Sequence, residues 1–283
     1  MSSLLLGTII TVASIVLAIA GLLVVRRTVP LEILADNHDV ATAMLGILGT
    51  LYAIVLGLVV VEAITRHSTA EMQESIEASN LVAMSELVRG TDRDFRERLI
   101  QAELDYCDAV VHGEWPLLAK GEAPDKDAVR AFSRTWGLVA RYQPKTTAEQ
   151  DLHSSLLSSM IQVSDARRYR LIASRHGLPK LLWLILIVGG VCTIAFTYCF
   201  AARNIKLQVV MTSIITLVFS LNMSLVLFFG KPYYGDLQVE PTSFLRCLAI
   251  LKKKPVLQHQ ENQQNREGTE PDDDLPPAND SAK

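Results

Sequence analysis

Residues 41–64 read ATAMLGILGTLYAIVLGLVVVEAI, a run of 24 residues in which Glu62 is the only charged side chain. An α-helix rises about 1.5 Å per residue, so this run would cover about 36 Å, more than the ~30 Å hydrocarbon core of a bilayer. Three further runs of similar length contain no Asp, Glu, Lys or Arg, and they occupy residues 4–25, 181–202 and 207–230. The sequence therefore predicts an all-α, polytopic membrane protein with four transmembrane helices.

The composition of the 283-residue chain agrees with that class. Hydrophobic residues make up 49% of it, charged residues only 20%, and the formal net charge is -3. A protein that binds nucleic acid through bulk positive charge would be strongly basic, so no nucleic-acid partner is expected. The lipid bilayer is the expected partner.

The first apolar run has a second interpretation, as a cleaved signal peptide, because Ala18-Ile19-Ala20 resembles a signal-peptidase site. However, Met1-Ser2-Ser3 carries no basic residue, and the apolar run continues beyond that site. It ends at Arg26 and Arg27, which are typical of an interfacial anchor. We therefore interpret the run as a span.

Residues 66–180 form an insert of mixed and nearly balanced charge between the second and third spans. Its apolar residues recur at helical spacing, which predicts about four helices. Gly and Pro are absent between Ile64 and Gly90, so we expect the first of these helices to continue directly from the second span. The predicted apolar stripes are Phe95/Leu99/Ala102/Tyr106/Val110, Val129/Phe132/Trp136/Val139 and Leu152/Leu156/Met160.

The domain organisation follows from these segments. The first transmembrane hairpin is predicted at 1–65, the helical insert at 66–180 and the second hairpin at 181–230. A membrane-proximal segment at 231–254 precedes a tail at 255–283, which is rich in Gln, Asn, Asp, Glu and Pro. That tail has too few large apolar residues to offset the entropy of ordering it, and we predict that it is disordered.

Four spans place the N-terminus, the insert and the tail on one side of the membrane. Lys and Arg next to the spans are more numerous on the insert's side, which favours a cytoplasmic insert and tail. Arg26 and Arg27 beside the first span argue for the opposite orientation. Cys192 and Cys199 lie within the third span, which leaves Cys107 and Cys247 outside the membrane and predicts no disulfide framework.

No catalytic signature for phosphate, zinc or acyl-transfer chemistry is found, so we expect no enzyme activity, no cofactor and no metal. The tetrapeptide Asp36-Asn37-His38-Asp39 could suggest a metal site. Asn37 or Asp39 is better explained as the residue that caps the second span, because short polar side chains satisfy the free N–H groups at a helix start.

The second span carries a ridge of small residues, Gly49, Ala53 and Gly57, that would let another helix approach closely. This ridge can pack within one subunit, which we favour slightly, or between subunits around a shared axis. Tyr52 could project into a narrow cavity or be an ordinary packing residue. As a hypothesis, the pore-lining or constricting residues are Gly49, Tyr52, Ala53, Leu56, Gly57 and Glu62.

Two polar features have alternative uses. Glu62 precedes Arg66 by four residues, so the two can form a structural ion pair, or Glu62 can be a charge at a pore mouth. In the fourth span a hydroxyl stripe can line a hydrated path, although bonding to a neighbouring helix is the commoner use. That stripe consists of Ser213, Thr216, Ser220 and Ser224.

Basic residues also precede the third span. Their position favours contact with anionic lipid headgroups, and the alternative is that they concentrate anions at the mouth of a path. They are Arg167, Arg168, Arg170 and Arg175.

Several short motifs in this order resemble those of the DUF4239 family of bacterial membrane proteins, which has a bestrophin-like domain. The resemblance extends from about Leu31 to Leu248, although Lys231-Pro232 departs from the acid or Arg expected before that proline. The motifs are Asn37, Gly49-Thr50-Leu51-Tyr52-Ala53-Ile54, Glu77-Ala78, Tyr106, Glu114-Trp115-Pro116, Arg167-Arg168, Leu178-Pro179, Trp183, Lys231-Pro232-Tyr233-Tyr234-Gly235 and Pro241.

The resemblance implies a homo-oligomer in the bacterial inner membrane that conducts inorganic ions along its second span. It does not imply calcium control, because the acidic calcium clasp and the repeated Phe of animal bestrophins have no counterpart here. We therefore expect an ion-conducting pathway, and the alternative is a non-conducting scaffold whose insert recruits a soluble partner.

Overall fold

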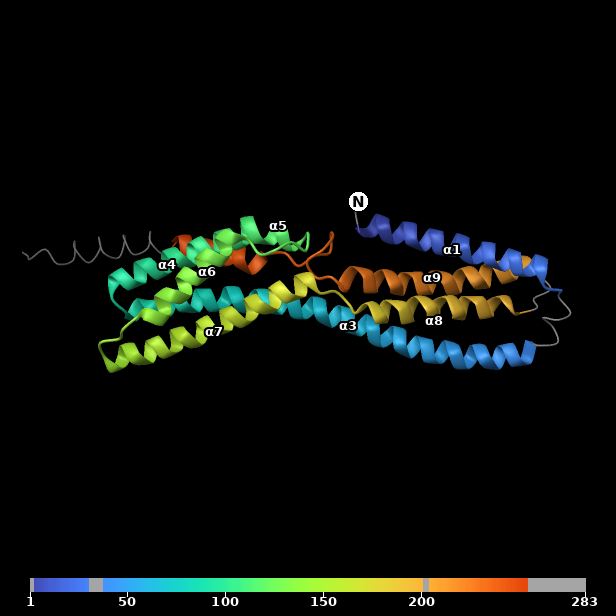
Figure 1. Cartoon of the computed structure of the whole chain (residues 1–283), viewed down its shortest axis with the longest axis horizontal. Helices are drawn as coiled ribbons and strands as arrows, with labels where there is room; N and C mark the ends of the chain where they lie inside the picture. Colours follow the sequence, from blue (N-terminus) through green and yellow to red (C-terminus); the bar gives the residue numbers. More distant parts are fainter. Residues whose placement is uncertain (1–2, 31–37, 201–203, 254–283) are drawn as a thin grey trace, which may run out of the picture.

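The computed structural model describes residues 3–30, 38–200 and 204–253, and every regular element in these ranges is helical. The molecule is elongated, with a membrane half and an insert half placed end to end (Figure 1). Four helices are long and apolar enough to cross a bilayer, as predicted. They are α1 (Ser3–Thr28), the first part of α3 (His38–Leu87), α8 (Lys180–Tyr198) and α9 (Ile205–Phe229).

The helix α3 runs without interruption from the membrane half into the insert half (Figure 1). Its 50 residues correspond to about 75 Å of helix. The continuity predicted from the absence of Gly and Pro after Ile64 is therefore confirmed. A single rigid element connects the bilayer to the soluble domain.

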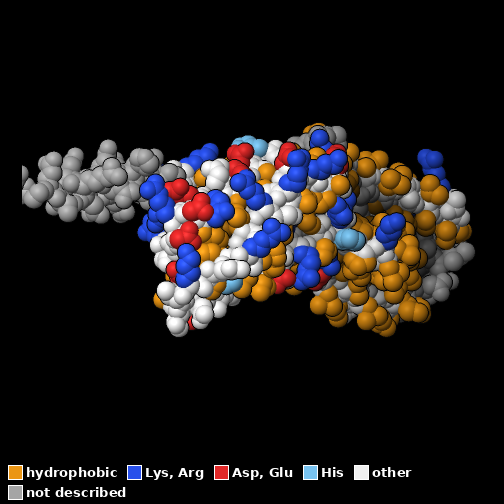
Figure 2. All heavy atoms as spheres, turned by 60° about the vertical axis from the view of Figure 1, so that its left-hand side comes forward, with side chains coloured by type: hydrophobic (Ala, Val, Ile, Leu, Met, Phe, Trp, Pro, Cys, Tyr) orange, Lys and Arg blue, Asp and Glu red, His pale blue; other side chains and the backbone are white. Residues whose placement is uncertain are grey.

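In the membrane half, α3 packs against α8 and α9, and α1 packs mainly against α9. A small apolar cluster lies at the junction of α3, α8 and α9, and it includes Leu56, Val59, Leu186 and Val226. On the face that Figure 2 shows, hydrophobic side chains dominate this half, whereas most of the charged side chains lie on the insert half. Such a large exposed apolar surface is the surface that a bilayer, or a further copy of the chain, would cover.

The insert half is a bundle built on the second part of α3 and on α7 (Thr147–Arg175). A short 3₁₀ turn, η1 (Val88–Gly90), follows α3. The other elements are α4 (Arg93–Asp108), the π-helix η2 (Ala109–Glu114), α5 (Trp115–Leu118), α6 (Lys126–Arg141) and a C-terminal helix at residues 242–253.

Helix starts in the insert have local causes in the sequence. Asp92, Asp125 and Thr146 each accept hydrogen bonds from backbone N–H groups in the first turn of α4, α6 and α7. Such caps satisfy donors that have no partner inside the helix. The chain leaves the α-helical conformation after α3, before α6 and before α7, in segments that contain Gly90, Pro124 and Pro144.

The first apolar stripe is confirmed, because its four residues in α4 and Val110 in η2 are all buried. The stripe predicted for α6 is partly wrong, because Val129 and Trp136 are exposed. The face of α6 that turns inward instead buries Ala128, Thr135 and Val139. The predicted tail at 255–283 and the capping residue Asn37 lie outside the described residues.

Candidate functional site

Tyr52 is buried inside the subunit between α3, α8 and α9. Its hydroxyl donates a hydrogen bond of 2.8 Å to the carbonyl oxygen of Leu186, and its ring packs edge-on against Phe219. The ring also lies so close to Gly189 that a Cβ there would overlap it. The hypothesis that Tyr52 constricts a path is therefore corrected, because its side chain fills space within one subunit.

Leu56 shares this inward face and is 6% exposed. It belongs to the apolar cluster at the junction of α3, α8 and α9, so it is also removed from the set of candidate pore-lining residues.

The ridge of small residues points away from the subunit's own helices. A Cβ added at Gly49 or Gly57 would meet no atom within 4 Å, and the same holds at Gly46. Ala53, between them, is exposed. The slight preference for packing within the subunit is therefore wrong, since no element of the described chain covers this ridge.

Glu62 lies off the ridge, five residues after Gly57. Its carboxylate accepts a 2.7 Å hydrogen bond from Nε of Arg66, one turn further along α3. Both side chains are partly exposed, so solvent weakens the pair. The structure thus contains the i, i+4 ion pair that the spacing allowed.

The hydroxyl stripe of α9 faces α1. The hydroxyl of Ser220 donates to Thr11 of α1 at 3.0 Å, while Thr216 and Ser224 donate to backbone carbonyls one turn earlier in α9. Ser213 lies at the edge of this seam and is half-buried. These hydroxyl groups form a polar seam within one subunit.

Two of the basic residues before the third span are buried in the centre of the insert. Arg170 is fully buried and Arg167 is 5% exposed, so contact with lipid headgroups is ruled out for both. They belong to a cluster, here called the charge cluster. Its members are Glu77 of α3, Tyr106 of α4, Glu114 of η2, and Arg167 and Arg170 of α7.

Arg170 occupies the middle of the charge cluster. Its Nε and Nη2 donate to the two carboxylate oxygens of Glu77 at 2.9 and 3.0 Å, and its Nη1 donates to Glu114 at 2.8 Å. Arg167 forms a second two-pronged pair with Glu114 at 2.8 and 3.2 Å. Two cations thus balance two anions, which is the arrangement that buried charges require.

The hydroxyl of Tyr106 connects the two halves of the charge cluster. It donates to Glu77 and accepts a 3.0 Å hydrogen bond from Nη1 of Arg167. Burial, and then the negative charge of Glu77, hold the pKa of Tyr106 well above its ordinary value. Tyr106 therefore remains a neutral hydrogen-bonding group at physiological pH.

Aromatic rings close the charge cluster on the remaining sides. The guanidinium carbon of Arg170 lies 5.3 Å from the Trp115 ring centre and 5.6 Å from that of Phe244, in the C-terminal helix. The ring centre of Phe132 in α6 lies 5.1 Å from the guanidinium carbon of Arg167. Burial acts to lower the pKa of Arg170, but Glu77 and Tyr106 raise it more, so the pKa lies well above its ordinary value.

The π-helix η2 explains how Glu114 and the adjacent Trp115 both reach the interior. A π-helix has a wider turn than an α-helix and often occurs at functional sites. Here it brings these two residues of the Glu114-Trp115-Pro116 motif against α7. The indole N–H of Trp115 then donates to the carbonyl oxygen of Val239 at 3.0 Å.

Another buried carboxylate, that of Glu74, lies beside the charge cluster. Glu74 of α3 accepts hydrogen bonds from the backbone N–H groups of Ser243 (2.7 Å) and Phe244 (3.1 Å), at the start of the C-terminal helix. Burial raises the pKa of Glu74, and these hydrogen bonds oppose that rise only in part. The C-terminal helix is thus capped by a side chain of α3.

The remaining two basic residues before the third span, Arg168 and Arg175, are exposed. Arg168 pairs with Asp165 at 3.0 Å, and Arg175 is in the last turn of α7, five residues before α8 begins. Of the four basic residues predicted to contact anionic headgroups, Arg168 and Arg175 are the two whose side chains are accessible for that contact.

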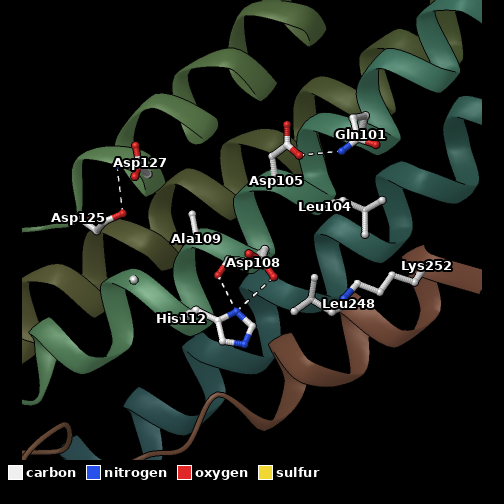
Figure 3. A pocket seen from close by; sticks show the side chains of 11 residues that line it. Gln101, Leu104, Asp105, Asp108, Ala109, His112, Asp125, Asp127, Leu248 and Lys252 are labelled. Carbon is white, nitrogen blue, oxygen red and sulfur yellow. Dashed lines mark hydrogen bonds and ion pairs between the residues drawn. The ribbon is translucent and has the colours of Figure 1, made fainter.

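A groove of about 650 Å³ lies on the insert surface, between α4, α6 and the C-terminal helix. Its acidic side chains face separate partners rather than a common point, as Figure 3 shows for Asp108 with His112 and for Asp105 with Gln101. Asp105 also pairs with Arg134 of α6 at 3.2 Å. In the described part of the chain, no group of three His, Cys, Asp or Glu side chains is placed to hold a metal ion.

Glu77 and Glu114 were not predicted as site residues, although both lie in motifs that carry the resemblance. A signal for the charge cluster exists in α7. Leu156, Met160, Val163, Arg167 and Arg170 follow one another at intervals of four, three, four and three residues, and all are buried. Two Arg residues in register with an apolar stripe indicate buried ion pairs.

Comparison with known proteins agrees with this architecture. Residues 12–244 match the family model of the bestrophin-like domain. No curated protein matches the chain in sequence.

Solved structures match over most of the chain. A bestrophin homologue from Klebsiella pneumoniae, in a form with one substitution, is 12% identical with a TM-score of 0.64, covering 86% of this chain and 98% of that one. Another structure of this homologue, phased on zinc, is also 12% identical, with a TM-score of 0.61 and coverages of 85% and 97%. A variant of a membrane protein is 10% identical with a TM-score of 0.65, and the coverages are 86% and 97%.

Proposed function

This chain belongs to the bestrophin-like family, and from that premise we propose that it forms a homo-oligomer that conducts inorganic ions. The pathway runs along the outward face of α3, around an axis shared by the subunits. The protein resides in a bacterial inner membrane, with the insert and the C-terminal tail in the cytoplasm. The reaction is passive conduction, with no catalytic step.

The observation that carries this proposal is the uncovered ridge on α3. Gly49, Ala53 and Gly57 leave a smooth surface that no helix within the described ranges occupies. Small residues at this spacing allow helices in lipid to approach closely. A ridge that is open in one subunit becomes the surface that faces other subunits, or the space that they enclose.

The direction of the ridge is fixed by contacts on another face of α3. Tyr52 and Glu77 are 25 residues apart, about seven helical turns, so they lie on the same face. Tyr52 holds that face against α8, and Glu77 holds it against Arg170 of α7. Gly57 is rotated from Tyr52 by about 140°, so these contacts turn the ridge outward.

Apolar residues provide the constriction in this proposal. Val61 and Ile64 follow Gly57 on the ridge by about one and two turns, and they are 61% and 46% exposed. Rings of such side chains around an axis can stop ion flow by dewetting and need no charged filter. Glu62, paired with Arg66, lies near the insert end of this segment, where it can influence the local ion concentration.

The test is a current recording from purified protein in planar bilayers. The mass of the purified assembly is measured first, to establish that it is an oligomer. We expect unitary currents in the wild type and a reduced conductance in Gly57→Trp, because an indole would obstruct the path. Leu184→Trp, at an exposed residue of α8, is the matched control and should leave the conductance unchanged. Flat recordings from an intact oligomer would overturn the proposal.

The second candidate function is a non-conducting scaffold that recruits a soluble protein. It is favoured by Val129 and Trp136 of α6, which are exposed apolar side chains seven residues apart on the insert. Flat recordings together with specific retention of a soluble protein, lost in Trp136→Ser, would select this function.

A further inference from the structure

Cys107 and Cys247 form a pair of thiols in contact, although 140 residues separate them in the sequence. Cys107 lies at the end of α4, and Cys247 lies in the C-terminal helix. Their Sγ atoms are 3.5 Å apart, both thiols are free, and the residues are 0% and 1% exposed. The sequence predicted no disulfide framework, and the structure shows how the fold nevertheless brings the two cysteines together.

We propose that Cys107 and Cys247 are an oxidation site at which a peroxide forms a reversible disulfide that joins the C-terminal helix to α4. A disulfide requires a sulfur–sulfur distance of about 2.05 Å, so the two Sγ atoms must approach by roughly 1.5 Å. Rotation of the two side chains and a small shift of the terminal helix achieve this. The proposal is independent of conduction.

In this proposal an oxidant approaches the pair through the groove described above. Asp108 and Leu248, the residues that follow the two cysteines, both line that groove (Figure 3). Leu104 of α4 and Lys252 of the C-terminal helix line it as well. The groove therefore lies over the seam in which the thiols are buried, and peroxide is little larger than water.

The reaction proceeds in two balanced steps. One cysteine loses its proton, its thiolate attacks a peroxide oxygen, and the O–O bond breaks to give a sulfenic acid and a hydroxide. The hydroxide takes up the proton that the thiol lost and becomes the first water. The second thiol attacks the sulfenic sulfur, which forms the S–S bond and releases a second water. Two thiols lose two hydrogens in total, and hydrogen peroxide is reduced to two waters.

The surroundings favour the reduced form in the resting protein. Contact with Cys247 and burial hold the pKa of Cys107 well above its ordinary value, and nearby carboxylates act in the same direction. The thiolate is the reactive form, so the pair reacts slowly until the helix shifts or the oxidant concentration rises. Cytoplasmic disulfides are usually transient and sense redox conditions, which fits this behaviour.

The disulfide would fix the C-terminal helix, which contacts both Glu74 of α3 and the charge cluster. The C-terminal helix starts at the Glu74 cap on α3, and its Phe244 covers Arg170 in the charge cluster. Joining this helix to α4 would prevent it from leaving the bundle. Oxidation would thus restrain the C-terminal helix, which α3 holds through Glu74.

The experiment treats full-length protein in detergent with hydrogen peroxide, blocks the remaining thiols with N-ethylmaleimide, and maps the peptides by mass spectrometry. We expect a linked pair of peptides containing Cys107 and Cys247, with the mass of two hydrogens lost, that dithiothreitol separates. The Cys192→Ser/Cys199→Ser double variant should form the same link, and Cys247→Ser should not.

Because Cys247→Ser could also disturb folding, the second measurement uses unmodified wild type only. Oxidised protein should unfold at a higher temperature than the same sample after dithiothreitol. The proposal is overturned if both thiols stay unreacted in the folded protein, or if either is oxidised to sulfinic acid without a link. A link to Cys192 or Cys199 would overturn it too.

Discussion

Arg170 and Glu77 form a two-pronged ion pair, at 2.9 and 3.0 Å, in a place where both side chains are fully buried. This pair connects α7 to α3, the helix that also carries the open ridge in the membrane. Glu114 shares the same guanidinium, so the arrangement depends on Arg170 more than on any other residue of the charge cluster. The charge cluster therefore holds α7 against the same helix that carries the proposed pathway.

Replacing Arg170 with Met should strongly destabilise the insert. The change leaves Glu77 and part of Glu114 buried without their partner, and breaking a buried pair in this way costs about 3–5 kcal/mol. The midpoint of thermal unfolding in detergent measures the effect. Arg168→Met is the matched control, since Arg168 is exposed and pairs only with Asp165, and it should cost less than about 1 kcal/mol. Equal midpoints for the two variants would show that the charge cluster does not support the fold.

Glu74→Gln should change how stability depends on pH. The folded-state pKa of Glu74 is raised, so the group's contribution to stability is fully present below its unfolded pKa and is lost as the pH rises through the folded pKa. Gln keeps an oxygen for the Ser243 and Phe244 N–H groups but does not ionise. Between pH 4 and pH 7, the unfolding midpoint of Glu74→Gln should therefore rise relative to that of the wild type as the pH rises. A shift in favour of the wild type would mean that the hydrogen bonds lower the pKa by more than burial raises it.

Gly189→Ala should destabilise the membrane half, because its Cβ would overlap the Tyr52 ring. Overpacking of this kind costs about 1–3 kcal/mol. Gly57→Ala is the control, since its Cβ would have no atom of the described residues within 4 Å. The fraction of protein that remains monodisperse after heating in detergent should fall for Gly189→Ala only. No loss for either variant would indicate that Tyr52 adjusts readily. A loss for both would indicate that the ridge is already covered.

A bulky residue at Ala53, between the two glycines of the ridge, should disturb assembly without unfolding the subunit. We expect the mass of the detergent-solubilised wild type to correspond to several copies, and Ala53→Trp to shift it toward smaller species. Leu184→Trp should not. A wild type that is entirely monomeric would remove the shared axis on which conduction depends.

The membrane spans and the continuity of α3 could be predicted from the sequence because they depend on local composition. Length, apolar content and the absence of Gly and Pro after Ile64 are properties of one segment at a time. The inward direction of Tyr52 could not be predicted, because it depends on a close approach to Gly189 and Leu186, more than 130 residues later in the chain. The same applies to the ridge, whose exposure is decided by where α8 and α9 pack.

The charge cluster illustrates a different limit. Arg167 and Arg170 precede an apolar span, and basic residues in that position usually contact headgroups. The periodicity of α7 contained the opposite indication, since both residues continue the buried stripe of Met160 and Val163. Their acidic partners come from α3 and the π-helix, and no local pattern specifies that pairing.

The proposed pathway is tested most directly by thiol modification of α3 during recording, in a Cys192→Ser/Cys199→Ser background. A charged, membrane-impermeant methanethiosulfonate should reduce the current through Gly57→Cys by more than half, because this residue lies on the open ridge. Leu56→Cys, the adjacent residue, faces α8 and α9 and should be unaffected. Block at Leu56→Cys with none at Gly57→Cys, or no current from an intact oligomer, would contradict the account.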